Sequence, residues 1–219
     1  MLRKLAFLTV ALVAGTASAA QILPSKSFTT DSNTAYTYTF TEAQTGSFLL
    51  DFTFSFTGKV ENNDFLGVWF GNANNINEGY KGPNVGFKAN CDEKGSCTND
   101  LFVRTVGTGG YFVPNSDLVE GETYRLFAHL YKSTANGFYD RFDLWLNPTA
   151  AEMTSLTGAD ASATEKTNLK SFDTIGIRTA NINGGPVLNV NPAEVPEPSS
   201  VALLGLAMAG LAFTRRKRA

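Results

Sequence analysis

The chain has very few of the residues that build zinc sites and common catalytic centres. It contains one histidine and two cysteines among 219 residues, and Cys91 and Cys97 form a single Cys-x5-Cys pair. A structural zinc ion needs about four Cys or His ligands, so the sequence predicts no zinc site. Gly-x-Ser-x-Gly, His-Glu-x-x-His and phosphate-binding glycine motifs are also missing. These absences argue against the common serine hydrolases, zinc metalloproteases and P-loop proteins.

Paired carboxylates in the arrangement that glycosidases need are missing as well. Such enzymes place an acid and a nucleophile on one face of the site. Asp140 and Asp143 are three residues apart on an expected strand and so face opposite sides, while Glu61 and Asp64 fall at a turn. The single histidine, His129, is more typical of a surface or pairing residue than of a catalytic base. We therefore expect no enzymatic activity, with an unrecognised glycan hydrolase as one alternative.

Helical periodicity is almost absent between the two ends, and the composition favours β-structure. The chain has 17 Phe and seven Tyr, and residues 47–57 alternate Phe or Leu with polar side chains, as in a strand with one buried face. Further strands are predicted at 35–41, 64–70, 84–88, 101–105, 111–113, 122–132, 138–146, 172–179 and 186–190. About ten short strands separated by turn residues predict an all-β, antiparallel two-sheet jelly-roll sandwich over residues 20–190.

Two segments depart from this pattern. Residues 148–170 are poor in bulky apolar side chains and predict a long surface loop with a helical turn near 150–153. Residues 191–198 are rich in proline and predict a linker that follows the folded domain.

The N-terminus has the three parts of a secretory signal peptide. Arg3 and Lys4 precede an apolar segment at residues 5–13, and Ala17, Ser18 and Ala19 form an A-x-A cleavage site. Cleavage after Ala19 makes residues 1–19 the signal peptide. In the oxidising compartment beyond the membrane, Cys91 and Cys97 are expected to form a disulfide bond.

The C-terminus has the features of a second targeting signal. A turn-forming segment comes first, then an apolar run at residues 201–213, and then a basic cluster. The turn-forming segment consists of Val195, Pro196, Glu197 and Pro198, and the basic cluster consists of Arg215, Arg216, Lys217 and Arg218. Thirteen residues of helix reach only about 20 Å against about 30 Å of hydrocarbon core. The basic side chains extend that reach by snorkelling and are retained on the cytoplasmic side. A short transmembrane helix is therefore predicted at residues 199–214.

This tail, residues 196–219 with its Pro-Glu-Pro motif, resembles the PEP-CTERM sorting signal of Gram-negative bacteria that make extracellular polysaccharide. The resemblance implies that the chain is held in the inner membrane, processed by an exosortase and delivered to the cell surface or extracellular matrix.

The net charge of the exported chain excludes some partners. Removal of both ends takes away six of the 18 basic residues and none of the 20 acidic ones, which leaves a net charge of −8. Nucleic acid and anionic lipid would repel such a chain. Neutral or cation-bridged glycans fit better.

The expected hairpin at residues 124–146 has one face with aromatic and polar side chains together. With its turn centred near Ala135, Tyr131 would lie beside Tyr139, His129 beside Arg141 and Arg125 beside Trp145. Rings that stack on sugars beside groups that bond hydroxyls are typical of a glycan site. The predicted ligand face consists of Arg125, His129, Tyr131, Tyr139, Arg141 and Trp145. Ordinary cross-strand pairs on an exposed sheet are the alternative.

Several strand patterns resemble concanavalin A-like, laminin-G-like sandwiches: residues 67–70, 124–131, 139–148 and 172–180. The resemblance implies a jelly roll with a concave face that binds glycans in some members. We expect a non-catalytic polysaccharide-binding module, or else a purely structural biofilm or matrix protein. No cofactor is predicted except calcium as a possibility, because two Asn-rich loops offer oxygen ligands: Asn62, Asn63 and Asp64, or Asn72, Asn74, Asn75, Asn77 and Glu78.

Overall fold

The computed structural model describes residues 22–90, 98–107 and 109–192. The predicted signal peptide, both cysteines, Val195 to Pro198 and the sorting tail lie outside the described residues. The disulfide bond between Cys91 and Cys97 is therefore not supported and stays a prediction. Among the described residues, no helix combines the length and the apolar character needed to cross a membrane, and the helix predicted at 199–214 is not among them.

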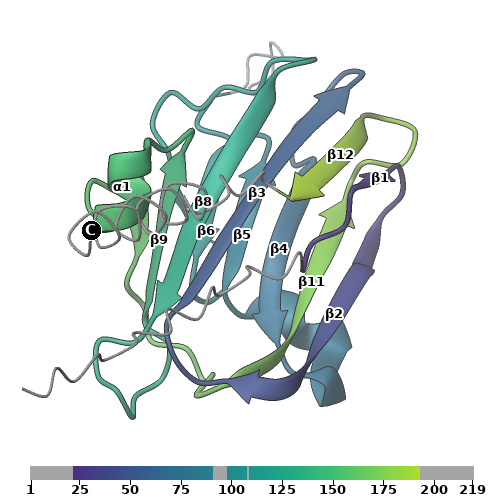
Figure 1. The fold of residues 1–219 in the computed structure, drawn as a ribbon. Coiled ribbons are helices and arrows are strands. Elements are labelled where there is room, and N and C mark those ends of the chain that lie inside the picture. Colours follow the sequence, from purple (N-terminus) through teal and green to yellow (C-terminus); the bar gives the residue numbers. More distant parts are fainter. Residues whose placement is uncertain (1–21, 91–97, 108, 193–219) are drawn as a thin grey trace, which may run out of the picture.

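Two antiparallel six-stranded sheets lie face to face, so the predicted all-β two-sheet fold is confirmed. Figure 1 views them through sheet A, with sheet B behind. Sheet A has the order β1 (Lys26–Phe28), β12 (Val187–Pro192), β3 (Phe48–Thr57), β8 (Thr123–Tyr131), β9 (Arg141–Leu146), β10 (Ala161–Ala163). Sheet B has the order β2 (Ser32–Gln44), β11 (Phe172–Ala180), β4 (Phe65–Gly71), β5 (Asn84–Lys88), β6 (Leu101–Arg104), β7 (Tyr111–Phe112).

The core lies between the sheets and follows the period-two pattern of the strands. Phe52, Phe54 and Phe56 of β3 are buried there, because alternate side chains of a strand point to the same face. Phe54 stacks on Phe87 of the opposite sheet with ring centroids 5.3 Å apart. Burial of such a ring stabilises the fold by about 1.5–3 kcal/mol.

Large aromatic side chains are also buried on the outer faces, away from this core. Trp69 of β4 is fully buried and its indole N–H donates to the carbonyl of Asn33, 3.1 Å away. Its ring lies against Gly176 of the neighbouring strand, where an added Cβ would come within 2.1 Å of the ring. The glycine therefore makes room for the indole.

Most of the predicted strands are present, and the differences fall in short or irregular elements. β1 and β10 were not predicted, since three residues are too few to show alternation. The predicted strand at 138–146 begins only at Arg141. The predicted helical turn is α1 (Ala150–Ser155), which a capping box of Thr149 and Glu152 begins, and a 3-10 helix, η1 (Ala73–Lys81), follows β4.

Candidate functional site

The strand pair that should carry the predicted ligand face has a different register. Tyr131 lies opposite Arg141, His129 opposite Asp143 and Phe127 opposite Trp145, so the predicted pairing is wrong by two residues. The connection is longer than predicted because residues 132–140 stay outside the strands: Ser133 donates its backbone N–H to the Asp140 carboxylate at 2.8 Å. A shift of two leaves the faces of both strands unchanged.

Two of the predicted ligand residues are buried, so the prediction that they are exposed is wrong. Trp145 does point away from the central core, but the chain after α1 covers it: it is 1% exposed and its indole N–H donates to the carbonyl of Thr157 at 3.0 Å. Tyr139 lies in the core, and its hydroxyl donates to the carbonyl of Gly46 at 2.8 Å. Burial raises the pKa of Tyr139 to about 12. Neither ring can stack on a sugar.

The other four residues of that face make contacts within the protein. Arg125 forms a bidentate ion pair with Asp51, with N–O distances of 3.0 and 2.6 Å. Arg141 donates to the carbonyls of Asp140 and Thr164. His129 bonds to the Ser47 hydroxyl at 2.6 Å and stacks on Tyr131 at 4.4 Å. Burial lowers the pKa of His129, and the negative charge of Asp143 offsets part of this change. These contacts make the face a poor candidate for ligand binding.

A pocket on the outer face of sheet B is the stronger candidate. Its cavity volume is about 600 Å³, within the usual range for ligand sites. We call it the basic pocket, and its lining residues are Asn63, Phe65, Lys81, Lys88, Arg104, Gly107, Arg178, Ala180 and Asn181. Four of them are cationic, and none of these described lining residues is acidic. This concentration of positive charge stands out in a chain that has more acidic than basic residues.

The sheet register brings the basic side chains of the pocket together. Phe65 of β4 lies opposite Lys88 of β5 on one side and Ala180 of β11 on the other. The Arg178 guanidinium lies 4.9 Å from the centre of the Phe65 ring, and that of Arg104 lies 5.7 Å from it. Cation–π contacts of this kind hold both guanidinium groups over one ring.

Two glycines lie opposite each other in the strands that carry Phe65 and Lys88. Gly67 of β4 lies opposite Gly86 of β5. A Cβ at Gly67 would come within 2.7 Å of the Phe65 ring, and one at Gly86 within 2.1 Å of the Leu66 carbonyl oxygen. The rim is tied together by Asn181, whose side-chain amide donates to the carbonyl of Asn63 at 2.8 Å.

The electrostatics of the pocket favour a negatively charged ligand. Burial, with the charge of Arg178 as a second cause, lowers the pKa of Arg104 to about 10. Arg104 remains protonated at neutral pH, although it is only 6% exposed. Planar carboxylates match the geometry of guanidinium groups.

A second pocket of about 420 Å³ adjoins the basic pocket, and Lys81 lines both. Its polar lining includes Asn72, Asn75 and Asn168, whose amides suit hydroxyl groups.

Calcium at the two Asn-rich loops stays a prediction, because the second loop is described only in part. The Asp64 carboxylate accepts the backbone N–H of Glu61 at 2.7 Å, and burial raises its pKa. The side chains of Asn77 and Glu78 lie outside the described residues. Within the described ranges, no group of three or more His, Cys, Asp or Glu residues could hold a metal ion.

Comparison with known proteins gives one family match and several distant structural ones. The structure of the alginate lyase Aly36B is similar to this one with a TM-score of 0.44, and the alignment covers 69% of each chain at 12% identity. The alginate lyase vAL-1 from Chlorella virus is 10% identical, covers 66% of this chain and 69% of its own, and has a TM-score of 0.36. No curated protein matches. Residues 194–218 match the PEP-CTERM protein-sorting motif, so the predicted sorting signal is confirmed and implies exosortase-dependent export.

Proposed function

We propose that this exported protein is a non-catalytic module that binds an anionic polysaccharide, at the cell surface or in the extracellular matrix, through its basic pocket. The observation that carries the proposal is the convergence of Arg104, Arg178, Lys81 and Lys88 on one cavity around Phe65. The sorting motif supports the location, because export brings the pocket into contact with extracellular polymers.

The chemistry of the pocket supports a glycan that carries carboxylates. A guanidinium group can bind a carboxylate through two parallel N–H···O bonds, which gives geometry as well as affinity. Asn63 and Asn181 at the rim can bond the hydroxyl groups of the same sugar. The adjoining second pocket, reached past Lys81, supports a polymer rather than a single small anion.

Two alternative functions, a glycan hydrolase and a purely structural matrix protein, would need different features in the structure. A glycan hydrolase would need two carboxyl groups that face one site, and none of the described lining residues of the basic pocket is acidic. A purely structural matrix protein would need no ligand pocket.

A matched pair of polymers tests the proposal. Polygalacturonate and its methyl ester share one backbone, but only the first carries free carboxylates. We expect the exported protein to bind polygalacturonate in a titration, with affinity falling as salt rises, and not to bind the ester. Equal binding of the two polymers would overturn the assignment, and release of new reducing ends would overturn the non-catalytic part.

Variants locate the binding in the pocket. Arg178→Gln and Lys88→Gln should each weaken binding about tenfold, because one charged hydrogen bond contributes about 1.5–3 kcal/mol. Lys132→Gln is the control: this lysine lies over the Tyr139 ring and lines neither pocket. Thermal unfolding separates lost binding from lost folding. An equal effect of the control would place binding elsewhere.

A further inference from the structure

The four sheet edges differ strongly in length. Sheet A ends in β1 and β10, of three residues each, and sheet B ends in β7, of two residues, and β2, of 13. Short edge strands are a common way in which proteins prevent pairing with another chain. β2 is an exception, with no proline and a high content of Thr and Tyr.

Among the described residues, no strand pairs with the free edge of β2, the edge that faces away from β11. Its strand partner is β11. Side-chain donors reach its backbone near the ends, where Trp69 bonds to Asn33, Lys26 to Ala35 and Gln44 to Glu42. In the described ranges no side chain bonds to the backbone of residues 36–41. A strand with one neighbour leaves half of its N–H and C=O groups available to a second strand.

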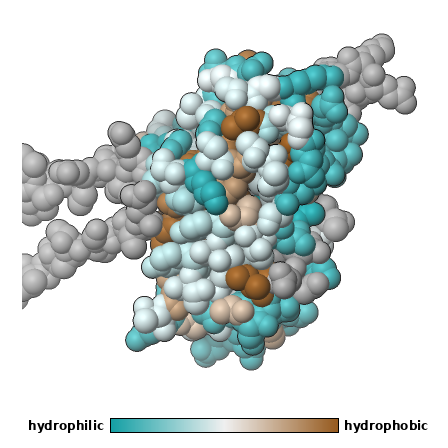
Figure 2. Space-filling model, turned by 90° about the vertical axis from the view of Figure 1, so that its right-hand side faces the viewer, coloured by the Kyte–Doolittle hydropathy of each residue, from teal (hydrophilic) through white to brown (hydrophobic). Residues whose placement is uncertain are grey.

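The side chains of this segment suit pairing with another strand. Tyr36 and Tyr38, opposite Ile177 and Ile175 of β11, are only half-buried. Thr37 and Thr39 alternate with them on the outer face. Figure 2 faces this side of the molecule, where a broad pale area of intermediate hydropathy contains little strongly hydrophilic surface. Aromatic and Thr–Thr cross-strand pairs each contribute about 0.2–1 kcal/mol.

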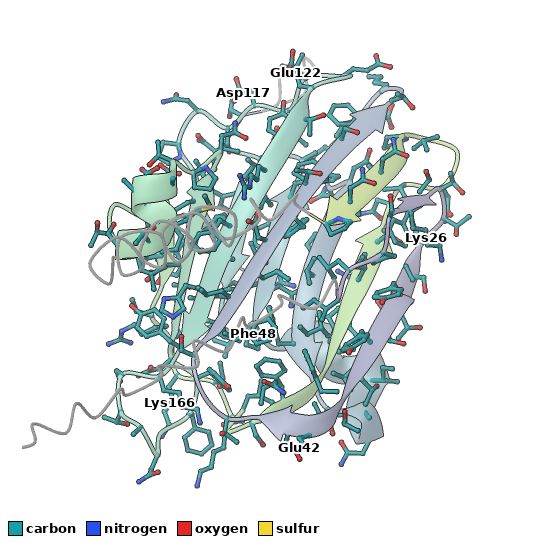
Figure 3. All side chains as sticks on the ribbon, viewed as in Figure 1. Lys26, Glu42, Phe48, Asp117, Glu122 and Lys166 are labelled. Atoms are coloured by element: carbon teal, nitrogen blue, oxygen red, sulfur yellow. The ribbon has the colours of Figure 1, made fainter. Side chains whose placement is uncertain are left out.

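The charges around β2 identify a second copy of this chain as the occupant. Glu42 is the one charged residue within β2, and the Lys26 ammonium lies 3.4 Å from the Ala35 carbonyl. Figure 3 shows Lys26 and Glu42 toward opposite ends of the strand. Antiparallel pairing about a two-fold axis at Tyr38 sets Thr34 opposite Glu42 of the other copy. Lys26 of each copy then lies near Glu42 of the other, and no like charges face each other.

We propose that β2 pairs with β2 of a second copy, so that the two B sheets form one continuous sheet in a two-fold dimer. An axis perpendicular to the sheet keeps both outer faces on the same side. If the basic pocket binds polymer as proposed above, the dimer presents two such pockets to one chain and gains avidity. The pairing itself does not depend on that function.

Variants that reverse the charges of Glu42 and Lys26 test the pairing. Residues 22–192 contain both sheets and the described core, so the signal-processed protein, residues 20–195, is suitable for sedimentation equilibrium. We expect a dimer whose dissociation constant rises at least tenfold in Glu42→Lys and in Lys26→Glu, and returns toward the original value in the double variant. Glu122→Lys, an exposed change at a distant loop, is the control and should leave the constant unchanged.

Two sedimentation results would overturn the proposal. The first is a wild-type protein that stays monomeric at all concentrations, which would also leave β2 to a different partner. The second is a double variant no better than the single ones. Amide hydrogen exchange gives an independent measurement: those amides of residues 36–41 that point away from β11 should become protected as the dimer forms. A dimer in which these amides exchange as fast as in the monomer would also refute strand pairing.

Discussion

At the scale of single residues, burial and not orientation decides the role of Trp145. Its ring points away from the central core yet packs against Phe127, 5.5 Å away, beneath the chain that follows α1. Trp145→Ala should therefore cost about 3–5 kcal/mol of stability in urea denaturation. Tyr131→Ala, on the same face but half exposed, should cost clearly less. A Trp145→Ala loss below about 1 kcal/mol would mean that the indole lies on the surface.

The single histidine makes one pH dependence easy to isolate. Burial lowers the pKa of His129 from its ordinary value of 6.5, so the folded state favours the neutral ring. The stability that this contributes is present above the unfolded pKa and is lost as pH falls through the folded pKa. His129→Gln should lack this loss as the pH falls below the ordinary His pKa of 6.5. An NMR titration that places the pKa of His129 above 6.5 would contradict the expectation.

At the scale of elements, the packing of β11 against β4 depends on a missing side chain. Trp69 occupies the space above Gly176, and a Cβ there would overlap its ring at 2.1 Å. Gly176→Ala should destabilise the protein by about 1–3 kcal/mol through overpacking. Gly46→Ala is the matched control, because a Cβ at Gly46 would have nothing within 4 Å. Equal unfolding midpoints for the two variants would show that the indole can move aside.

At the scale of the whole molecule, the sorting motif at residues 194–218 predicts a chain that is processed before release. Replacement of Arg215, Arg216, Lys217 and Arg218 by Ser should weaken membrane retention, since the cytoplasmic anchor of the short apolar segment is lost. Replacement of Pro196, Glu197 and Pro198 by Ala should leave an unprocessed, membrane-bound form. Mass spectrometry of the released protein measures the result, and a released chain that still carries Phe213 would contradict the prediction.

The features that the sequence by itself determined are local ones. The alternation from Phe48 to Thr57 predicts β3 because a strand repeats every two residues, whatever surrounds it. The sorting signal is read from contiguous residues in the same way, and residues 194–218 match the motif. The faces of β8 and β9 were also predicted correctly, since a register error of two residues does not change them.

Only the tertiary structure decided which outward residues are covered and which charges meet. Thr157 lies over Trp145, and Gly46 accepts the Tyr139 hydroxyl, through contacts between segments whose proximity no local pattern encodes. The four cations of the basic pocket come from η1, β5, β6 and β11, so no spacing along the chain reveals them. The physical reason is that strand order and register place residues side by side in space. Hydrophobic periodicity specifies only the face on which each residue lies.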